Sequence, residues 1–274
     1  MAAAEPLAKT TADPMVVVDN LHVVYRVFGS KSDKGTAATA LWRILRRQRR
    51  PSVREVHAIR GISFVANRGD AVGVIGRNGS GKSTLLRAIA GLLPPEQGAV
   101  YTTGHASLLG VNAALLDDLT GERNVVVCGL AMGMTPREVK DKYQGIVDFS
   151  GVGDFINLPM RAYSTGMGSR LRFAIASARS HEVLLIDEAL VTGDAEFRVR
   201  SRQRIEELRA QAGTVFIVAH SMAQIEETCN RVIWLEKGQI VRAGDDVPAI
   251  IDAYLAATGG EPLVREGAKN PLTP

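Results

Sequence analysis

Gly76-Arg77-Asn78-Gly79-Ser80-Gly81-Lys82-Ser83-Thr84 decides the fold, because it fits the pattern G-x-x-x-x-G-K-[ST] of a phosphate-binding loop. Its glycines allow positive φ and close backbone approach, so that successive N–H groups can turn inward onto an anion. Lys82 supplies a positive charge for β- and γ-phosphates, and the Ser83 hydroxyl is a hard oxygen ligand for Mg²⁺. An accidental match arises about 1% of the time in a chain of this length and composition. We therefore take all nine residues as a nucleotide-binding loop.

The residues on either side of the loop agree with this interpretation. Residues 71–75 are predicted to form a buried strand, and residues 83–90 an amphipathic helix. The N-terminus of such a helix favours negative charge. Strand, loop and helix together predict a phosphate site.

Composition limits the class of protein. The chain has 274 residues, of which 46% are hydrophobic, so it can bury a sizeable core as one large domain or as a domain with an insertion. Its net charge of +4 is mildly basic and unlike that of a histone-like protein. Cys128 and Cys229 are far apart, as expected of reduced core thiols in the cytosol. The sequence lacks an apolar run of the roughly 18 residues that a membrane span needs, and it lacks a signal peptide. We expect a soluble, cytoplasmic chain that reaches a membrane through a partner.

The order of the elements predicts an α/β fold with a helical insertion. Residues 1–14 are expected to be disordered, 15–245 to form the folded domain, and 246–274 to form a helix (248–257) and a mobile tail. Helices dominate from about residue 112 to residue 180, with the clearest at 141–150 and 169–178. The predicted strands are 15–18 continuing over 21–27, 56–65, 69–75, 99–102, 107–109, 182–186, 214–219, 232–236 and 239–241, and further helices are 198–212 and one from 221.

Residues 40–51 form an unusual basic segment. Leu41, Ile44 and Leu45 fall at i, i+3 and i+4, five arginines cover the rest, and Pro51 ends the predicted helix. Such a helix suits an anionic membrane surface. A solvated basic helix packed on its own domain, or a nucleic-acid contact, remains an alternative.

A second motif is the apolar strand Val183–Ile186 followed by Asp187 and Glu188. Downstream of a phosphate-binding loop, the first acid typically serves Mg²⁺. The second can act as general base on an attacking water, an effect of about 10²–10⁴ in rate. An acidic pair at a strand end is weak evidence alone, but its place after the loop favours the functional interpretation.

Tyr163-Ser164-Thr165-Gly166-Met167, which opens a predicted helix over 168–178, resembles the Leu-Ser-Gly-Gly-Gln signature of ATP-binding cassette (ABC) ATPases. Three further segments resemble the same family: residues 191–194, ending in Asp194, its D-loop; residues 218–220, ending in His220, its switch histidine; and residues 119–124, the opening of its helical subdomain. The resemblance covers residues 15–244. It implies a P-loop (RecA-like) nucleotide-binding domain with an antiparallel β portion and an inserted α-helical subdomain.

The variant signature, the residues that follow the two acids and the basic insertion narrow the resemblance to ATPase subunits of polysaccharide exporters. That subfamily moves lipid-linked O-antigen, teichoic acid or mycobacterial galactan. Some members carry a C-terminal carbohydrate-binding domain, which we do not expect here. A composition rich in Ala, Arg and Val and poor in Lys is typical of high-GC bacteria and favours galactan.

The resemblance also implies a mechanism. Two subunits clamp two ATP molecules head to tail, so that Ser164, Thr165, Gly166 and Asp194 of one subunit approach the nucleotide of the other. Lys82 and the loop hold the phosphates, Ser83 and Asp187 hold Mg²⁺, Glu188 is the base and His220 senses the γ-phosphate. The implied partners are a second copy and two copies of a polytopic permease, at the cytoplasmic face of the bacterial inner membrane, without nucleic acid.

Two roles stay open. The Q-loop glutamine is missing, and Asn112 is the nearest substitute as a ligand near Mg²⁺. Either Tyr25 or His57 could stack on adenine, and core packing is an alternative for Tyr25.

Rival classes share the phosphate loop. A GTPase or a small-molecule kinase has no use for residues 163–167 and His220, and an Asn-Lys-x-Asp guanine motif is missing. A soluble ABC ATPase acting on ribosomes or DNA usually has two cassettes or long coiled coils. An ABC importer subunit fits the variant signature less well.

Overall fold

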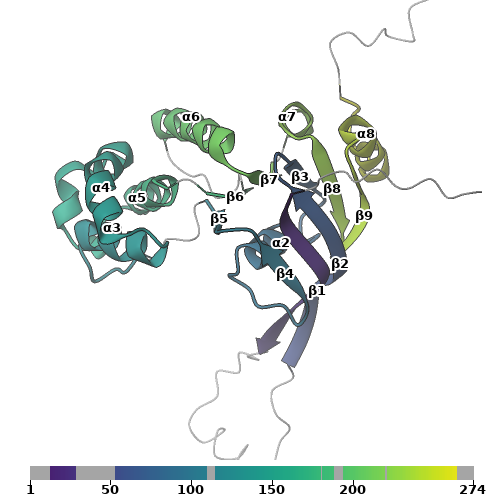
Figure 1. Cartoon of the computed structure of the whole chain (residues 1–274), viewed down its shortest axis with the longest axis horizontal. Helices are drawn as coiled ribbons and strands as arrows, with labels where there is room; N and C mark the ends of the chain where they lie inside the picture. Colours follow the sequence, from purple (N-terminus) through teal and green to yellow (C-terminus); the bar gives the residue numbers. More distant parts are fainter. Residues whose placement is uncertain are drawn as a thin grey trace, which may run out of the picture.

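The computed structural model describes residues 13–28, 53–109, 115–179, 181–187, 194–219 and 221–263. These residues form two β-sheets and a separate group of helices (Figure 1). The predicted basic helix over 40–51, nearly all of the predicted N-terminal segment and the end of the predicted tail lie outside the described residues.

The smaller sheet is antiparallel, with the order β2-β1-β4. β1 (Pro14–Phe28) and β2 (Val53–Asn67) are long strands, and β4 (Gln97–Thr102) is short. The two predicted pieces of β1 form one strand, whose pairing with β2 shifts between Val18 and Leu21. Asn20 has a φ of 43° at that shift. This irregularity lets one strand carry both apolar runs.

The larger sheet contains six strands in the order β5-β6-β7-β3-β8-β9. Its strands are β5 (Ala106–Leu108), β6 (Val183–Asp187), β7 (Thr214–Val218), β3 (Ala71–Ile75), β8 (Arg231–Glu236) and β9 (Gln239–Gly244). All neighbours are parallel except β8 and β9. Every residue of β6 and β7 is buried, as expected of a parallel sheet covered on both faces. The loops that follow β3, β6 and β7 therefore share one edge of the sheet, where α/β proteins bind ligands.

Helices connect these strands. α2 (Lys82–Ile89) follows β3, α6 (Ala195–Gln211) follows β6, and α7 (Met222–Thr228) follows β7. α8 (Val247–Thr258) packs on β8, where Tyr254 meets Trp234 edge to face with ring centroids 5.6 Å apart. The last helix is thus part of the packed structure.

A helical group lies at one end of the molecule, far from α8 (Figure 1). It contains α3 (Gly121–Ala131), α4 (Pro136–Ser150), the short η1 (Gly153–Asn157) and η2 (Met160–Ala162), and α5 (Thr165–Ser177). These helices have a hydrophobic cluster of their own, centred on residues such as Val125, Ile146 and Leu171. An inserted helical region was predicted over about residues 112–180, and these helices lie within those bounds.

Three helices start earlier than the sequence pattern predicts, because capping residues set their starts. α4 begins at Pro136 instead of residue 141, behind a capping box formed by Thr135 and Glu138. α5 begins at Thr165 instead of residue 168, with Ser164 as N-cap, and α6 begins at residue 195 instead of 198, with Asp194 as N-cap.

Cys128 and Cys229 are buried thiols, as the sequence predicted for core cysteines. Within the part of the chain that the structure describes, no helix has both the length and the apolar character needed to cross a membrane.

Candidate nucleotide-binding site

The phosphate-binding loop turns between β3 and α2 through glycines in the left-handed region. Gly76 has a φ of 148° and Gly81 a φ of 110°. A Cβ at Gly76 would overlap the carbonyl oxygen of Leu235, and one at Gly81 would lie 2.8 Å from the carbonyl oxygen of Ala58. Glycine is therefore required at both positions by backbone conformation and by close packing.

Lys82 is held at the mouth of this loop. Its Nζ donates to the carbonyl oxygens of Gly76 at 2.6 Å and Arg77 at 3.0 Å. Burial lowers the pKa of Lys82, and the nearby Asp187 carboxylate opposes that shift. The ammonium group is thus placed beside the loop that would cradle phosphates.

Ser83 and Asp187, predicted as Mg²⁺ ligands from distant parts of the sequence, lie together. The Ser83 hydroxyl donates to Asp187 Oδ2 at 2.8 Å, and Asp187 is only 5% exposed at the end of β6. Mg²⁺ prefers hard oxygen ligands and usually binds proteins through one or two of them together with substrate phosphates. The pair next to the phosphate loop fits that requirement.

A cleft of about 570 Å³ opens over the loop, a size typical of small-molecule sites. It brings together most of the predicted nucleotide contacts. Tyr25 Oη lies 3.4 Å from Thr84 Oγ1, and His57 lies on the neighbouring strand. The lining consists of Tyr25, Val56, His57, Ala58, Arg60, Asn78, Gly79, Gly81, Lys82, Ser83, Thr84, Asp187, Val218 and Lys237.

Other loop residues have different environments. The Arg77 guanidinium donates to the carbonyl oxygen of Thr258 at the end of α8, 3.1 Å away, and is not part of the cleft lining. Ser80 is buried, and its hydroxyl has no hydrogen-bond partner among the described residues. Ser80 therefore supports the loop from inside rather than lining the cleft.

Arg60 and Lys237 are cationic lining residues that the sequence analysis missed. Arg60 lies on β2, and Lys237 lies in the turn between β8 and β9 with a φ of 47°. The next residue, Gly238, donates its N–H to the carbonyl oxygen of Ser80 at 2.9 Å, which packs this turn against the phosphate loop. No local sequence motif marks either residue, because they come from distant segments that meet at the cleft only in the folded protein. Both favour an anionic ligand.

Residues 163–167, which resemble the signature motif, and Asp194 are not part of the cleft lining, and α5, which begins in that segment, contacts Asp194 through Arg170. Ser164 Oγ accepts the N–H of Met167 at 3.2 Å, so the hydroxyl proton stays available for donation. Asp194 Oδ1 accepts the N–H of Phe197 at 2.8 Å, and Oδ2 accepts Arg170 Nη1 at 3.0 Å. These two interactions, the N–H of Phe197 foremost, lower the pKa of Asp194. Arg170, which the sequence analysis missed, thus joins α5 to the start of α6.

Three predicted site residues, Glu188, His220 and Asn112, lie outside the described residues. Glu188 follows directly after β6 in the sequence, and His220 follows shortly after β7. Those strand ends are neighbours, since Asp187 pairs with Val218. Their roles stay predictions.

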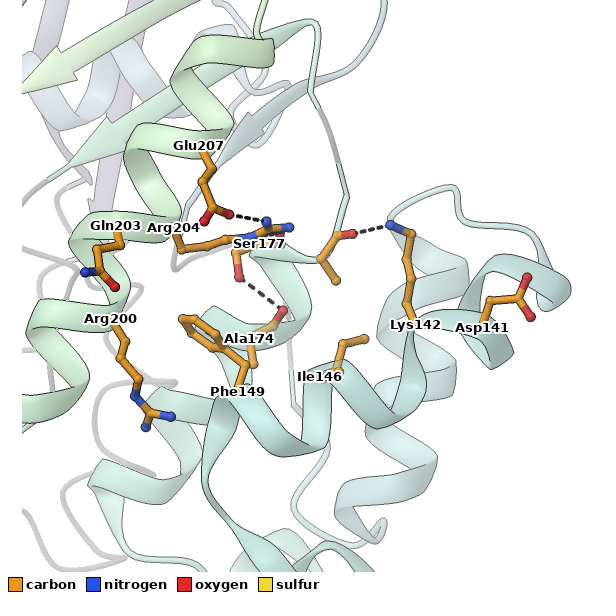
Figure 2. Close-up of a pocket in the computed structure, with 12 residues that line it drawn as sticks. Asp141, Lys142, Ile146, Phe149, Ala174, Ser177, Arg200, Gln203, Arg204 and Glu207 are labelled. Atoms are coloured by element: carbon orange, nitrogen blue, oxygen red, sulfur yellow. Dashed lines mark hydrogen bonds and ion pairs between the residues drawn. The ribbon is translucent and has the colours of Figure 1, made fainter.

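A second cavity, of about 450 Å³, lies between α4, α5 and α6 (Figure 2). Lys142 Nζ donates to the carbonyl oxygen of Ala178 at 2.7 Å, and Arg204 donates to that of Ser177 at 2.7 and 3.1 Å. Both cations neutralise the C-terminal end of α5. The cavity is thus a joint between the helical group and α6, and its lining contains none of the phosphate-loop residues.

Comparison with known proteins agrees with this geometry. The family model described as ABC transporter matches residues 59–191. The O-antigen export system ATP-binding protein RfbB of Klebsiella pneumoniae is 37% identical over 205 residues, which are 74% of this chain and 83% of that protein. The chain therefore belongs to the ABC transporter family of ATP-binding proteins.

Other relatives are longer than the matched region. The teichoic acids export ATP-binding protein TagH of Bacillus anthracis is 39% identical over 72% of this chain and 36% of its own length. TagH of Listeria innocua is 40% identical over 69% of this chain and 56% of its own length. The chain thus spans between about a third and just over half of these TagH proteins.

Solved structures show the same fold at lower identity. An ATP-binding subunit of an ABC transporter superposes with a TM-score of 0.62 at 20% identity, covering 89% of this chain and 93% of that one. A dimeric ATP-binding cassette in a post-hydrolysis state with ADP and Pi has a TM-score of 0.61 at 20% identity, covering 84% and 98%. The α/β cassette fold predicted from the sequence is confirmed.

Proposed function

We propose that this chain binds ATP with Mg²⁺ and hydrolyses it to drive an ABC exporter of a lipid-linked polysaccharide. One observation carries the nucleotide part of the proposal. The 2.8 Å contact between Ser83 and Asp187 places two hard oxygen donors beside Lys82 and the phosphate loop. This arrangement suits a nucleoside triphosphate with its metal ion.

Each residue of the site has a distinct task in this proposal. The loop N–H groups and Lys82 bind the β- and γ-phosphates, and Ser83 and Asp187 hold Mg²⁺, which would neutralise charge on those phosphates. Glu188 takes the proton of the attacking water, and His220 contacts the γ-phosphate. Asn112 stands in for the missing glutamine.

A second copy of the chain completes the site. The N-terminus of α5 offers backbone N–H groups and the Ser164 hydroxyl, which suit the γ-phosphate held by a facing subunit. Thr165 and Gly166 belong to the same turn, and Arg170, further along α5, binds Asp194. We therefore propose a head-to-tail homodimer with two ATP molecules between the subunits.

The names of the relatives support the transport part of the proposal, since they are ATP-binding proteins of teichoic acid and O-antigen export. The proposed partners are two copies of a polytopic permease, with the ATPase at the cytoplasmic face of the inner membrane. The basic segment 40–51 is proposed to contact anionic lipid there. Composition favours galactan as the polymer, and we expect no nucleic acid partner.

Co-purification from native membranes tests this function. The tagged chain, extracted in mild detergent, should bring down a polytopic membrane protein in equal amount, and the complex should hydrolyse ATP. Lys82→Ala is the matched control, because it should keep the partner and lose hydrolysis. Recovery of ribosomal proteins or DNA from a wholly soluble chain would refute the transport role and leave an ATPase of another class.

A further inference from the structure

Two histidines form a hydrogen-bonded pair at the wall of the nucleotide cleft. His57 lines the cleft from β2, and His22 lies on the adjacent β1. His22 Nδ1 and His57 Nε2 are 3.2 Å apart, and the ring centroids are 5.3 Å apart with the planes tilted by 40°. His22 Nε2 in turn lies 3.3 Å from Asn20 Oδ1.

These contacts allow one arrangement of protons in the neutral pair. An amide oxygen only accepts hydrogen bonds, so His22 Nε2 must carry the proton that reaches Asn20. His22 Nδ1 is then an acceptor, and His57 Nε2 must carry the proton between the two rings. The chain of donors therefore runs from His57 to His22 to Asn20.

The far end of this chain is firmly built. Asn20 sits at the irregularity of β1, and its N–H donates to Ser63 Oγ at 2.8 Å. Gly61, with a φ of 69°, leaves room for the contact, because a Cβ there would lie 2.9 Å from His22 Nε2 and 3.1 Å from Asn20 Oδ1. The His22 ring is thus fixed by its contact with Asn20 and by the close approach of Gly61, in addition to its contact with His57.

The exposed ring of His57 needs such support if it is to contact a ligand. With the phosphates on the loop, the rest of a nucleotide extends along the wall that contains Tyr25, Val56 and His57. The Tyr25 hydroxyl is near Thr84, in the first turn of α2 and thus close to the phosphates. His57 lines the same cleft and offers a second ring on which a base can stack.

We propose that His22 is a positioning residue that holds the His57 ring in one tautomer and one orientation for stacking on the nucleotide base. The inference rests on the proposed nucleotide-binding function and deepens it. His22 itself need not touch the nucleotide, so its effect must pass through His57.

Binding of Mg·ATP compared with binding of Mg·tripolyphosphate separates the base from the phosphates. Base stacking contributes the equivalent of about five- to 150-fold in affinity. His57→Ala should therefore weaken the binding of ATP by about tenfold and leave the binding of tripolyphosphate unchanged. His22→Leu should weaken the binding of ATP about fivefold, which is the effect of losing one neutral hydrogen bond, and should again leave the binding of tripolyphosphate unchanged. His22→Gln keeps an acceptor for His57 and should bind ATP nearly as the wild type does.

Two further measurements exclude a merely structural role. In the His57→Ala background, His22→Leu should have no additional effect on ATP, because the interaction it supports is gone. Nitrogen-15 NMR of the ligand-free protein should show both rings protonated on Nε2 at pH 8. His105→Leu, an exposed histidine outside the cleft lining, is the matched control and should bind both ligands normally.

The proposal is wrong if His22→Leu weakens ATP and tripolyphosphate equally, if its effect adds fully to that of His57→Ala, or if His22 carries its proton on Nδ1. A wild-type chain that binds neither ligand would instead refute the nucleotide-binding function itself, and this inference with it. Weaker binding of ATP by the histidine variants, with tripolyphosphate binding intact, supports both the nucleotide-binding function and the positioning role of His22.

Discussion

Replacing Ser83 with alanine removes the hydroxyl that joins the phosphate-binding loop to the end of β6. In the folded protein this hydroxyl donates to Asp187 Oδ2 at 2.8 Å, and Asp187 is 5% exposed. A hydrogen bond to a charged group contributes about 1.5–3 kcal/mol, and the lower value applies because Ser83 itself is exposed. We expect the free energy of unfolding to fall by about 1.5 kcal/mol, which lowers Tm by about 2–4 °C per kcal/mol.

The larger effect concerns Mg²⁺. Loss of a partner in the outer shell of a metal site already weakens metal binding by about 10–100-fold, and Ser83 is proposed to bind the ion directly. Titration calorimetry with ATP should therefore show that Mg²⁺ strengthens binding by the wild type and by Ser83→Thr, which keeps the hydroxyl. Ser83→Ala should lose most of this strengthening, whereas all three proteins should bind ATP alike in excess EDTA.

If Ser83→Ala binds Mg·ATP as tightly as Ser83→Thr does, with the same difference between Mg²⁺ and EDTA, then the hydroxyl is not a metal ligand. If the variant instead binds ATP weakly in EDTA as well, the loss comes from a damaged loop. Thermal unfolding of each variant, run beside the titrations, separates these two results.

Three further predictions concern stability. Gly81→Ala should lower Tm and ATP affinity, because φ is 110° and the new Cβ would lie 2.8 Å from Ala58 O; an unchanged Tm would contradict this. Arg204→Met removes two hydrogen bonds to the end of α5 and should cost about 1–3 kcal/mol in urea unfolding, whereas Arg202→Met, exposed on the same helix, should cost less than about 0.5 kcal/mol. Burial lowers the pKa of His181, so below the ordinary value of 6.5 the unfolded chain binds a proton that the folded chain does not. The free energy of unfolding should therefore decrease as the pH is lowered from 7 to 5, and the accompanying drop in urea midpoint should be smaller in His181→Gln.

The phosphate loop could be predicted from the sequence because its chemistry is local. Glycines, a lysine and a hydroxyl at fixed spacing determine the turn, and the structure places Lys82 and Ser83 beside one another at the start of α2. Asp187 could be predicted because an acid ends a fully apolar strand. Asp187 contacts Ser83 because β6, which ends in Asp187, and β3, which precedes the phosphate loop, end at the same edge of the sheet.

Features that depend on distant strands could not be predicted in this way. Arg60 and Lys237 reach the cleft from β2 and from the turn after β8, and the pairing of β1 with β2 brings His22 to His57. The starts of α5 and α6 were missed for a different reason. Ser164 and Asp194 were interpreted as loop residues of functional motifs, although both also cap helices.

The most direct test of the account is the oligomeric state of Glu188→Gln with and without Mg·ATP, measured by sedimentation velocity. This variant should bind ATP and be nearly unable to hydrolyse it, so the nucleotide should hold two subunits together. We predict a monomer without nucleotide and a stable dimer with Mg·ATP, abolished when Lys82→Ala is added. A Glu188→Gln variant that hydrolyses ATP rapidly, or that binds ATP and stays monomeric, would contradict the account.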